Sequence, residues 1–399
     1  MEMVDFSAKQ PALGYMYQAQ YALWLLLSGP EERELVLETL DDIVLEKEGT
    51  ARDLLQLKHH GTASSLTNSS PELWKTLRIW STHLKDSSVA VPPTVLTLIT
   101  TATAPAGSIA SNLRHGQNRK STAALDELRK IANKSENETL QTAFEVFKAL
   151  SDDQQKRLVD AIFILDNSPD ISGTGKLIRN EIRFAVDRQN REGLFERLEG
   201  WWLGKVVDQL NTKKPMPIAG FEVHDKLRAI AEQFGPDALP IDYLDAKPDD
   251  LNPNIDDRMF VRQLRAIDVK LGRIEKAMLD YYRAFEQRSR WAREELLVGD
   301  EVERYERRLI DEWQRFAAVV TEDLNDTAAD LELKKAGREI FNWMELKANI
   351  RIRDNVTEPY VMRGSFHLLA DKSTPAVWWH PKFMERLGQI LGAEASAAS

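Results

Sequence analysis

A glutamine and a lysine lie two residues apart near the end of a short apolar segment, DLLQLKHH, from Asp53 to His60. Alternate side chains of a β-strand share one face, so Gln56 and Lys58 point the same way, opposite to Leu55 and Leu57. Two interpretations of this pair are open. It is either the solvated face of an ordinary strand or one half of a metal-dependent site that hydrolyses phosphodiester bonds.

Acidic residues that would complete such a site lie earlier in the chain. Asp42 precedes Gln56 by 14 positions (56 − 42), which leaves room for one strand, a turn at Glu48-Gly49 and a second strand. If those strands are antiparallel neighbours, Asp42 comes to lie beside Gln56 and Lys58. Glu38 shares the face of Asp42 if their strand is continuous. The predicted catalytic residues are therefore Glu38, Asp42, Gln56 and Lys58.

These side chains suit hydrolysis with Mg²⁺, for which Mn²⁺ can substitute. Mg²⁺ prefers oxygen ligands, and the expected ligands are Asp42, the amide oxygen of Gln56, and Glu38, which supplies the charge that an amide lacks. Lys58 would orient or help to deprotonate the attacking water, and would stabilise the charge that develops on the phosphate. A Q-x-K spacing occurs by chance in many strands, so the surrounding elements have to support this interpretation.

The pattern of apolar residues predicts the elements that position the site. Helices are expected over 14–28 and 71–85, and the second of them begins at a proline, which suits a first helical turn. Strands are expected at each end of 34–49, over 53–60 and over 94–101. This αβββαβ order is that of a small mixed sheet with helices packed against it.

The rest of the chain has mainly helical spacing. Helical additions are expected from about 120 to 212, a linker over 213–220, and a mainly helical C-terminal domain over 221–399. A long helix from about 257 to 297 and a second from 300 to about 324 carry charges of both signs, which is typical of helices that associate. The predicted fold class is mixed α+β, with an N-terminal domain over 1–212.

Three short motifs in the N-terminal domain carry a resemblance to a known family. They are GYMYQ at 14–18, ETLDDI at 38–43 and QLKHH at 56–60. Together they resemble the PD-(D/E)XK nuclease superfamily in its Q-x-K variant, and more closely the double-stranded DNA endonuclease domain of CD-NTase-associated anti-phage effectors. The resemblance covers roughly the first 210 residues and implies a restriction-endonuclease-like core.

The same resemblance assigns roles to particular residues. It implies that Asp42, Gln56 and Lys58 carry catalysis, while Glu38 and Gln18 match further positions of the family. Two other side chains lie near the predicted site. His60 shares the face of Lys58 and is a candidate contact to metal or phosphate. Tyr15, on the first helix, is expected to be a packing residue.

A second motif lies near the C-terminus. The segment MRGSFHLLADKSTPAVWWHPKFMERL, at 362–387, is similar to the closing module of effector subunits in bacterial ABC three-component systems, the group that includes Lamassu defence. This similarity implies a nuclease subunit restrained by an SMC-like ABC ATPase and a small third subunit, active as a homo-oligomer. The alternative is a non-catalytic helical scaffold or DNA-binding subunit with a degenerate nuclease fold.

Composition restricts the partners. The net charge of −10 argues against binding nucleic acid over the whole surface. No acidic residue lies between Ser87 and Leu125, where Arg114, Arg119 and Lys120 form a candidate DNA-binding patch; on charge alone, an ordinary loop with solvated cations is the alternative. There is no cysteine, which excludes thiolate metal sites and disulfides. No apolar run reaches the roughly 18–20 residues of a membrane span. A cytoplasmic protein without membrane contact is expected.

Overall fold

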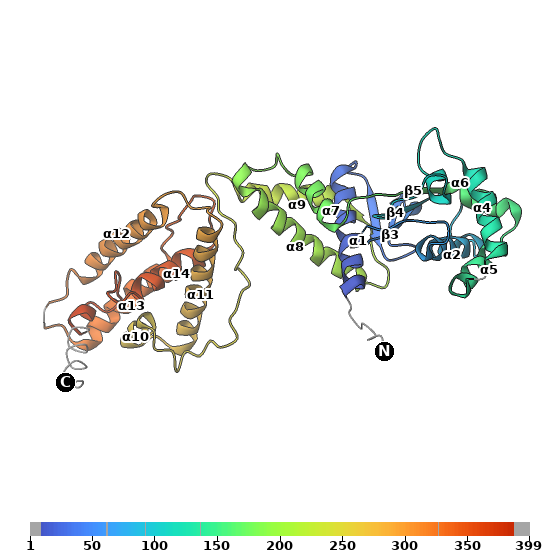
Figure 1. Ribbon diagram of the computed structural model, residues 1–399. Helices are drawn as coiled ribbons and strands as arrows, with labels where there is room; N and C mark the ends of the chain where they lie inside the picture. The colour runs from blue at the N-terminus through green and yellow to red at the C-terminus, as the bar shows by residue number, and fades with distance from the viewer. Residues whose placement is uncertain (1–8, 61–62, 92, 136, 326, 387–399) are drawn as a thin grey trace, which may run out of the picture. The chain divides into compact units, whose positions relative to one another are not determined.

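The computed structural model describes residues 9–60, 63–91, 93–135, 137–325 and 327–386 (Figure 1). The chain divides into two compact units between Ala231 and Glu232, and each is described by itself. Leu387, the last residue of the C-terminal motif, lies outside the described residues. Within the described ranges, no helix is long and apolar enough to span a membrane.

The N-terminal unit is built on a sheet with the strand order β5-β4-β3-β2-β1-β6. The strands are β1 (Glu34–Leu37), β2 (Ile43–Lys47), β3 (Thr50–Lys58), β4 (Val95–Thr100), β5 (Ile162–Leu165) and β6 (Ile218–Ala219). β1, β2 and β3 pair antiparallel, and β3, β4 and β5 pair parallel. The sheet is therefore mixed, as the sequence predicts.

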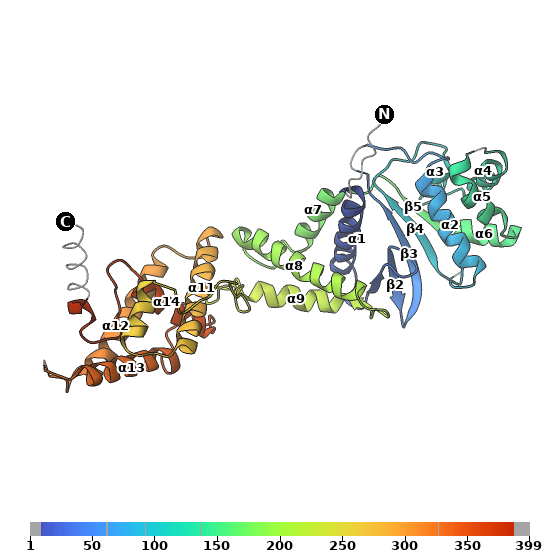
Figure 2. The same cartoon turned by 90° about the horizontal axis from the view of Figure 1, so that it is seen from below.

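Helices cover both faces of this sheet (Figure 2). α1 lies on one face together with α7 and α8, and α2 lies on the other together with α4, α5 and α6. The helices of the unit are α1 (Lys9–Ser28), α2 (Pro71–Lys85), α3 (Ile109–Asn112), α4 (Ser121–Lys134), α5 (Gln141–Lys148), α6 (Asp152–Ala161), α7 (Ile171–Glu181), α8 (Arg191–Leu210) and α9 (Gly220–Glu232). The predicted order of elements up to β4 is confirmed, whereas the assignment to the restriction-endonuclease family stays a prediction.

α2 matters most for the site, and its sequence explains its place. Pro71 occupies the first turn, and Leu73, Leu77 and Trp80 fall on the buried face. These side chains join Leu54 of β3 in the main apolar core of the unit. α2 is therefore fixed against the sheet beside the strand that carries Gln56 and Lys58.

Two segments differ from the sequence prediction. The region from 120 to 212 is not wholly helical, because the apolar run Ile162–Leu165 pairs in parallel with β4 as strand β5. The predicted linker at 213–220 contains β6, which pairs with β1, and the division between the units lies later, after Ala231. In both cases a short segment pairs with the edge strand of the sheet. Such long-range pairing cannot be predicted from the local periodicity of apolar residues.

The C-terminal unit is helical, as predicted. Its helices are α10 (Met259–Ala266), α11 (Leu271–Arg293), α12 (Glu301–Thr321), α13 (Asp330–Leu346) and α14 (Pro359–Ala370). The single long helix predicted over 257–297 is wrong, because the chain turns at Asp268, whose φ is +59°. The carbonyl of Ile267, freed at this break, accepts a hydrogen bond from Arg338 Nη1 at 2.9 Å. A contact from distant α13 thus compensates the break.

Candidate active site

Strand pairing brings Asp42 and Gln56 together. Ile43 of β2 pairs with Leu55 of β3 in antiparallel register, so Asp42 lies opposite Gln56. Asp42 Oδ2 accepts a hydrogen bond from the backbone N–H of Leu57 at 2.7 Å. Both side chains are buried, with 9% of Asp42 and 3% of Gln56 exposed. The structure therefore produces the juxtaposition that the hairpin spacing predicts.

Glu38 reaches the same place by a different route from the one predicted. The strand is not continuous, because β1 ends at Leu37 and β2 begins at Ile43. Glu38 has a φ of +52°, and its N–H donates to the Asp42 carbonyl at 3.1 Å across the turn. Partial burial and the charge of Asp42 raise the pKa of the Glu38 carboxyl, while Lys58 lowers it. Glu38 thus lies within the electrostatic reach of both residues.

Asp41 is a further acid that sequence reasoning missed. It is 7% exposed, its Oδ2 accepts from Trp80 Nε1 at 2.6 Å, and its Oδ1 accepts from the N–H of Asp42 at 3.2 Å. Burial raises the pKa of the Asp41 carboxyl to about 7; the Asp42 charge adds to this, and Trp80 and Lys58 oppose it. Because both Asp41 oxygens are engaged by protein donors, Asp42 is the better metal ligand of the two.

Lys58 is the last residue of β3 and provides a positive charge next to these carboxylates. Its side chain is half-buried, and its charge lowers the pKa of both the Glu38 and the Asp41 carboxyl. This cluster, defined as Glu38, Asp41, Asp42, Gln56 and Lys58, is called the carboxylate–lysine cluster. If a metal cation is bound by the carboxylates, the neighbouring ammonium group is well placed to bind a phosphate oxygen or the attacking water.

One oxygen of the cluster lacks a hydrogen-bond partner among the described residues. Gln56 Oε1 is buried and, in the described part of the chain, has no hydrogen-bond partner. Buried polar atoms without partners are costly and call for an explanation, and an amide oxygen beside a carboxylate is a donor pair that Mg²⁺ accepts. The described residues hold no group of three or more His, Asp or Glu placed to bind an ion, so such a site depends on the Gln56 amide.

The first helix adds further unpartnered atoms. Tyr15 Oη and Gln18 Oε1 are buried and lack hydrogen-bond partners in the part that the structure describes. Burial and the charge of Glu38 raise the pKa of the Tyr15 hydroxyl, so Tyr15 is close enough to Glu38 to feel it. Tyr15, expected as a packing residue, is therefore a polar neighbour of the cluster. Nothing in the spacing of α1 indicates this.

His60 is bound elsewhere than predicted. Its Nε2 lies 2.5 Å from Glu72 Oε2 on α2, and its N–H donates to Thr101 Oγ1 at 2.8 Å. The imidazole thus links the end of β3 to α2. It is engaged with a helix carboxylate rather than directed at a metal or phosphate beside Lys58.

The predicted DNA-binding arginines serve the fold. Arg114 forms a two-bond pair with Asp166, at 2.7 and 2.6 Å. Arg119 donates to four main-chain carbonyls, those of Leu113, Ile162, Val159 and Asp160. Lys120 is exposed and remains available for phosphate. Arg119 is thus engaged within the fold, whereas Arg114 and Lys120 are exposed, and DNA binding by the patch stays a prediction.

Arg119→Ala is expected to destabilise the N-terminal unit by about 2 kcal/mol, since several buried carbonyls would lose a charged donor. Thermal denaturation would measure the loss. The control is Lys120→Ala, whose exposed side chain should leave the melting temperature unchanged. A variant lacking Arg119 that melts like the wild type but binds duplex DNA less tightly would contradict this structural role.

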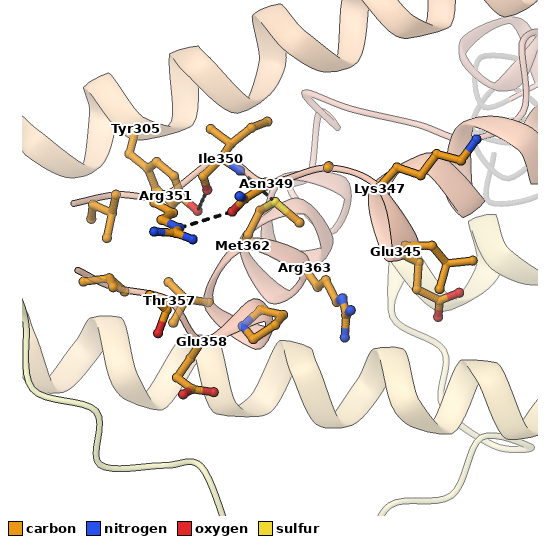
Figure 3. Close-up of a pocket in the computed structure, with 16 residues that line it drawn as sticks. Tyr305, Glu345, Lys347, Asn349, Ile350, Arg351, Thr357, Glu358, Met362 and Arg363 are labelled. Atoms are coloured by element: carbon orange, nitrogen blue, oxygen red, sulfur yellow. Dashed lines mark hydrogen bonds between the residues drawn. The ribbon is translucent and has the colours of Figure 1, made fainter. Parts of the chain in front are cut away.

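The C-terminal unit has a cavity of about 280 Å³ between α12, the segment after α13, and the start of α14 (Figure 3). Polar groups at its edge are engaged: Tyr305 Oη donates to the Ile350 carbonyl at 2.9 Å, and Arg351 Nε to Asn349 Oδ1 at 3.2 Å. Glu345 accepts from Arg273 Nε at 3.0 Å. Of the two acids that line the cavity, Glu345 and Glu358, the first is thus held by an arginine, so the described residues do not gather several free carboxylates there.

Comparison with known families identifies the C-terminal region. Residues 260–387 match the family described as C-terminal domain 7 of the ABC-three component (ABC-3C) systems. The matched segment is less than half of the chain and lies in the C-terminal unit. The match supports the interpretation of this chain as a component of an ABC-three component anti-phage system, in agreement with the resemblance of the C-terminal motif. The nuclease activity, the cofactor and the partner subunits stay predictions.

Comparisons with solved structures are weaker. The chain is similar to the Acinetobacter baumannii Cap4 SAVED/CARF-domain containing receptor with the cyclic trinucleotide 2'3'3'-cAAA, at 16% identity and a TM-score of 0.31, over 55% of this chain and 46% of that one. For the Moraxella osloensis Cap4 receptor the values are 13%, 0.29, 69% and 68%. At these TM-scores the likeness supports no conclusion. Curated proteins give no match.

Proposed function

We propose that this protein is the nuclease subunit of an ABC-three component anti-phage system and hydrolyses phosphodiester bonds of double-stranded DNA with Mg²⁺. The observation that carries the proposal is the pairing of Asp42 with the unpartnered amide oxygen of Gln56, beside Lys58. The family match at 260–387 supports the system. The N-terminal motifs support the reaction through their resemblance to Q-x-K nucleases.

The residues divide the work of hydrolysis among them. Asp42, Gln56 and Glu38 would hold Mg²⁺, or Mn²⁺ in its place, through oxygen atoms. The bound ion supplies Lewis-acid polarisation of the phosphate and lowers the pKa of a bound water. Lys58 orients that water, and its ammonium stabilises the extra negative charge on the phosphate oxygens. Asp41 stabilises the turn between β1 and β2, because its carboxylate accepts hydrogen bonds from Trp80 and from the Asp42 N–H.

The C-terminal unit would connect this activity to its control. We propose that it binds the SMC-like ABC ATPase and the small third subunit, which restrain the nuclease until foreign DNA is sensed. One site cuts one strand, so cleavage of both strands requires two copies, and a homo-oligomer is the proposed active form. The match of the C-terminal region to a domain of three-component systems supports this division.

A second candidate is a scaffold subunit that binds partners or DNA without catalysis. The observation that favours it is that the family match covers the C-terminal region alone. A degenerate site would be free to lose its buried polar groups, whereas Asp42 and Gln56 are both buried and intact. Catalysis is therefore the preferred candidate, and a cleavage assay separates the two.

Asp42→Asn is expected to abolish cleavage while the fold is kept, because asparagine still accepts from the Leu57 N–H but lacks the charge that binds a cation. Plasmid cleavage by the full chain with its partner subunits should require Mg²⁺ or Mn²⁺ and stop in EDTA. Asp53→Asn, three residues before Gln56 on the same strand, is the matched control. Cleavage that persists in EDTA or in Asp42→Asn would contradict the metal site, and no cleavage by the wild-type complex would favour the scaffold.

A further inference from the structure

α2 contacts both segments that carry the proposed catalytic groups. At its first turn, Glu72 Oε2 lies 2.5 Å from Nε2 of His60. His60 follows Lys58 by two positions in the chain. The Glu72 side chain is largely buried, at 12% exposed, so water competes little for this contact. The first turn of α2 thus holds the end of β3, and with it Lys58, by a charged hydrogen bond.

Nearer its C-terminus, α2 holds the turn between β1 and β2. Trp80 Nε1 donates to Asp41 Oδ2 at 2.6 Å, and His83 Nε2 lies 2.8 Å from the Leu40 carbonyl oxygen. Asp41 in turn accepts from the N–H of Asp42 at 3.2 Å. A chain of hydrogen bonds therefore runs from the helix to the backbone of the proposed metal-binding residue.

The turn between β1 and β2 is not stabilised by regular secondary structure. Residues 38–42 form no regular structure between β1 and β2, and Glu38 has a left-handed φ of +52°. Such segments are more mobile than the elements they connect. α2 itself is rigid in comparison, because Leu73, Trp74 and Leu77 are buried in the apolar core. The turn is thus held against a helix whose inner face is anchored in the core.

We propose that α2 is the positioning element of the site, and that its two side-chain contacts, Trp80–Asp41 and Glu72–His60, set the separation between Asp42 and Lys58. This inference rests on the proposed nuclease function. In this role Trp80 and Glu72 are positioning residues that act through Asp41 and His60. Displacing a catalytic group by about 1 Å can cost about 100-fold in rate, so both contacts carry a kinetic consequence.

The sharpest test compares two tryptophans of α2. Trp80→Phe keeps a buried aromatic ring but removes the N–H that binds Asp41, together with part of the ring volume. Trp74→Phe is the matched control, since Trp74 is also buried and its Nε1 donates to the Asn68 carbonyl at 2.8 Å, away from the acids. In the full chain with its partner subunits, Trp80→Phe should lower kcat by about 10- to 100-fold and leave KM for DNA within about twofold. Trp74→Phe should change neither.

Metal affinity gives a readout that does not depend on cleavage. Loss of a group that orients a metal ligand weakens metal binding by about 10- to 100-fold, and Trp80→Phe should do so for Mn²⁺ measured by titration calorimetry. At the other contact, Glu72→Gln keeps a hydrogen-bond acceptor for His60 and should retain most activity. Glu72→Ala should lose activity to a similar extent as Trp80→Phe.

The outcomes separate this inference from the proposed function. If the wild-type complex cleaves and Lys58→Ala does not, but Trp80→Phe cleaves and binds Mn²⁺ like the wild type, the positioning role is wrong and the nuclease stands. Equal losses in Trp80→Phe and Trp74→Phe would also overturn it, because the effect would then follow general stability. A wild-type complex without metal-dependent cleavage would overturn both.

Discussion

Lys58→Ala is expected to reduce plasmid cleavage by at least about 100-fold, the scale on which one preformed charge-stabilising group contributes to catalysis. Lys58 is the cation of the carboxylate–lysine cluster, since its charge acts on both Glu38 and Asp41. Alanine removes the only ammonium that the described residues place among these carboxylates. The loss should appear in kcat, because the charge on the phosphate develops during the reaction.

A matched control and a folding check accompany this variant. Lys47→Ala removes an exposed lysine at the end of neighbouring β2, and should leave cleavage and stability unchanged. Circular dichroism and thermal melting should show Lys58→Ala folded. Wild-type rates in Lys58→Ala would remove the lysine from the mechanism, whereas an unfolded variant would be replaced by Lys58→Met, which keeps most of the side-chain length.

Gly364→Ala is expected to destabilise the C-terminal unit by about 3 kcal/mol, the second large effect. Gly364 lies where α14 packs on α11, and a Cβ there would overlap the backbone carbonyl of Asp280 and the side chain of Ala284. Both obstacles are rigid, because one is helix backbone and the other is a buried methyl group. The helices would have to separate, and the core between them would lose contacts.

Gly272→Ala is the control within the same helix pair. A Cβ at Gly272, in the first turn of α11, would meet no atom within 4 Å, so alanine should be neutral or stabilise the helix by up to about 1 kcal/mol. Calorimetric melting of the full chain would measure both variants. A melting transition for Gly364→Ala equal to that of the wild type would show that the two helices can yield.

Local sequence patterns were enough to predict the elements from α1 to β4 and one juxtaposition within the site. The order from α1 to β4 follows from local apolar patterns, since each element is recognised by its own period. The pairing of Asp42 with Gln56 also follows, because a short connection between strands leaves few registers open. The N- and C-terminal motifs indicated families, and the match at 260–387 supports the second of them.

Contacts between distant elements decide which partners the polar side chains have. Of two consecutive acids, Asp41 accepts from Trp80, a residue 39 positions away, whereas Asp42 accepts from the Leu57 N–H and is the proposed ligand of a cation. Arg119 is predicted to contact DNA because of its charge, but its guanidinium donates hydrogen bonds to main-chain carbonyls around β5. These outcomes depend on which donors a distant element brings near. Side-chain type gives the capacity for chemistry, but packing decides which partner each group meets.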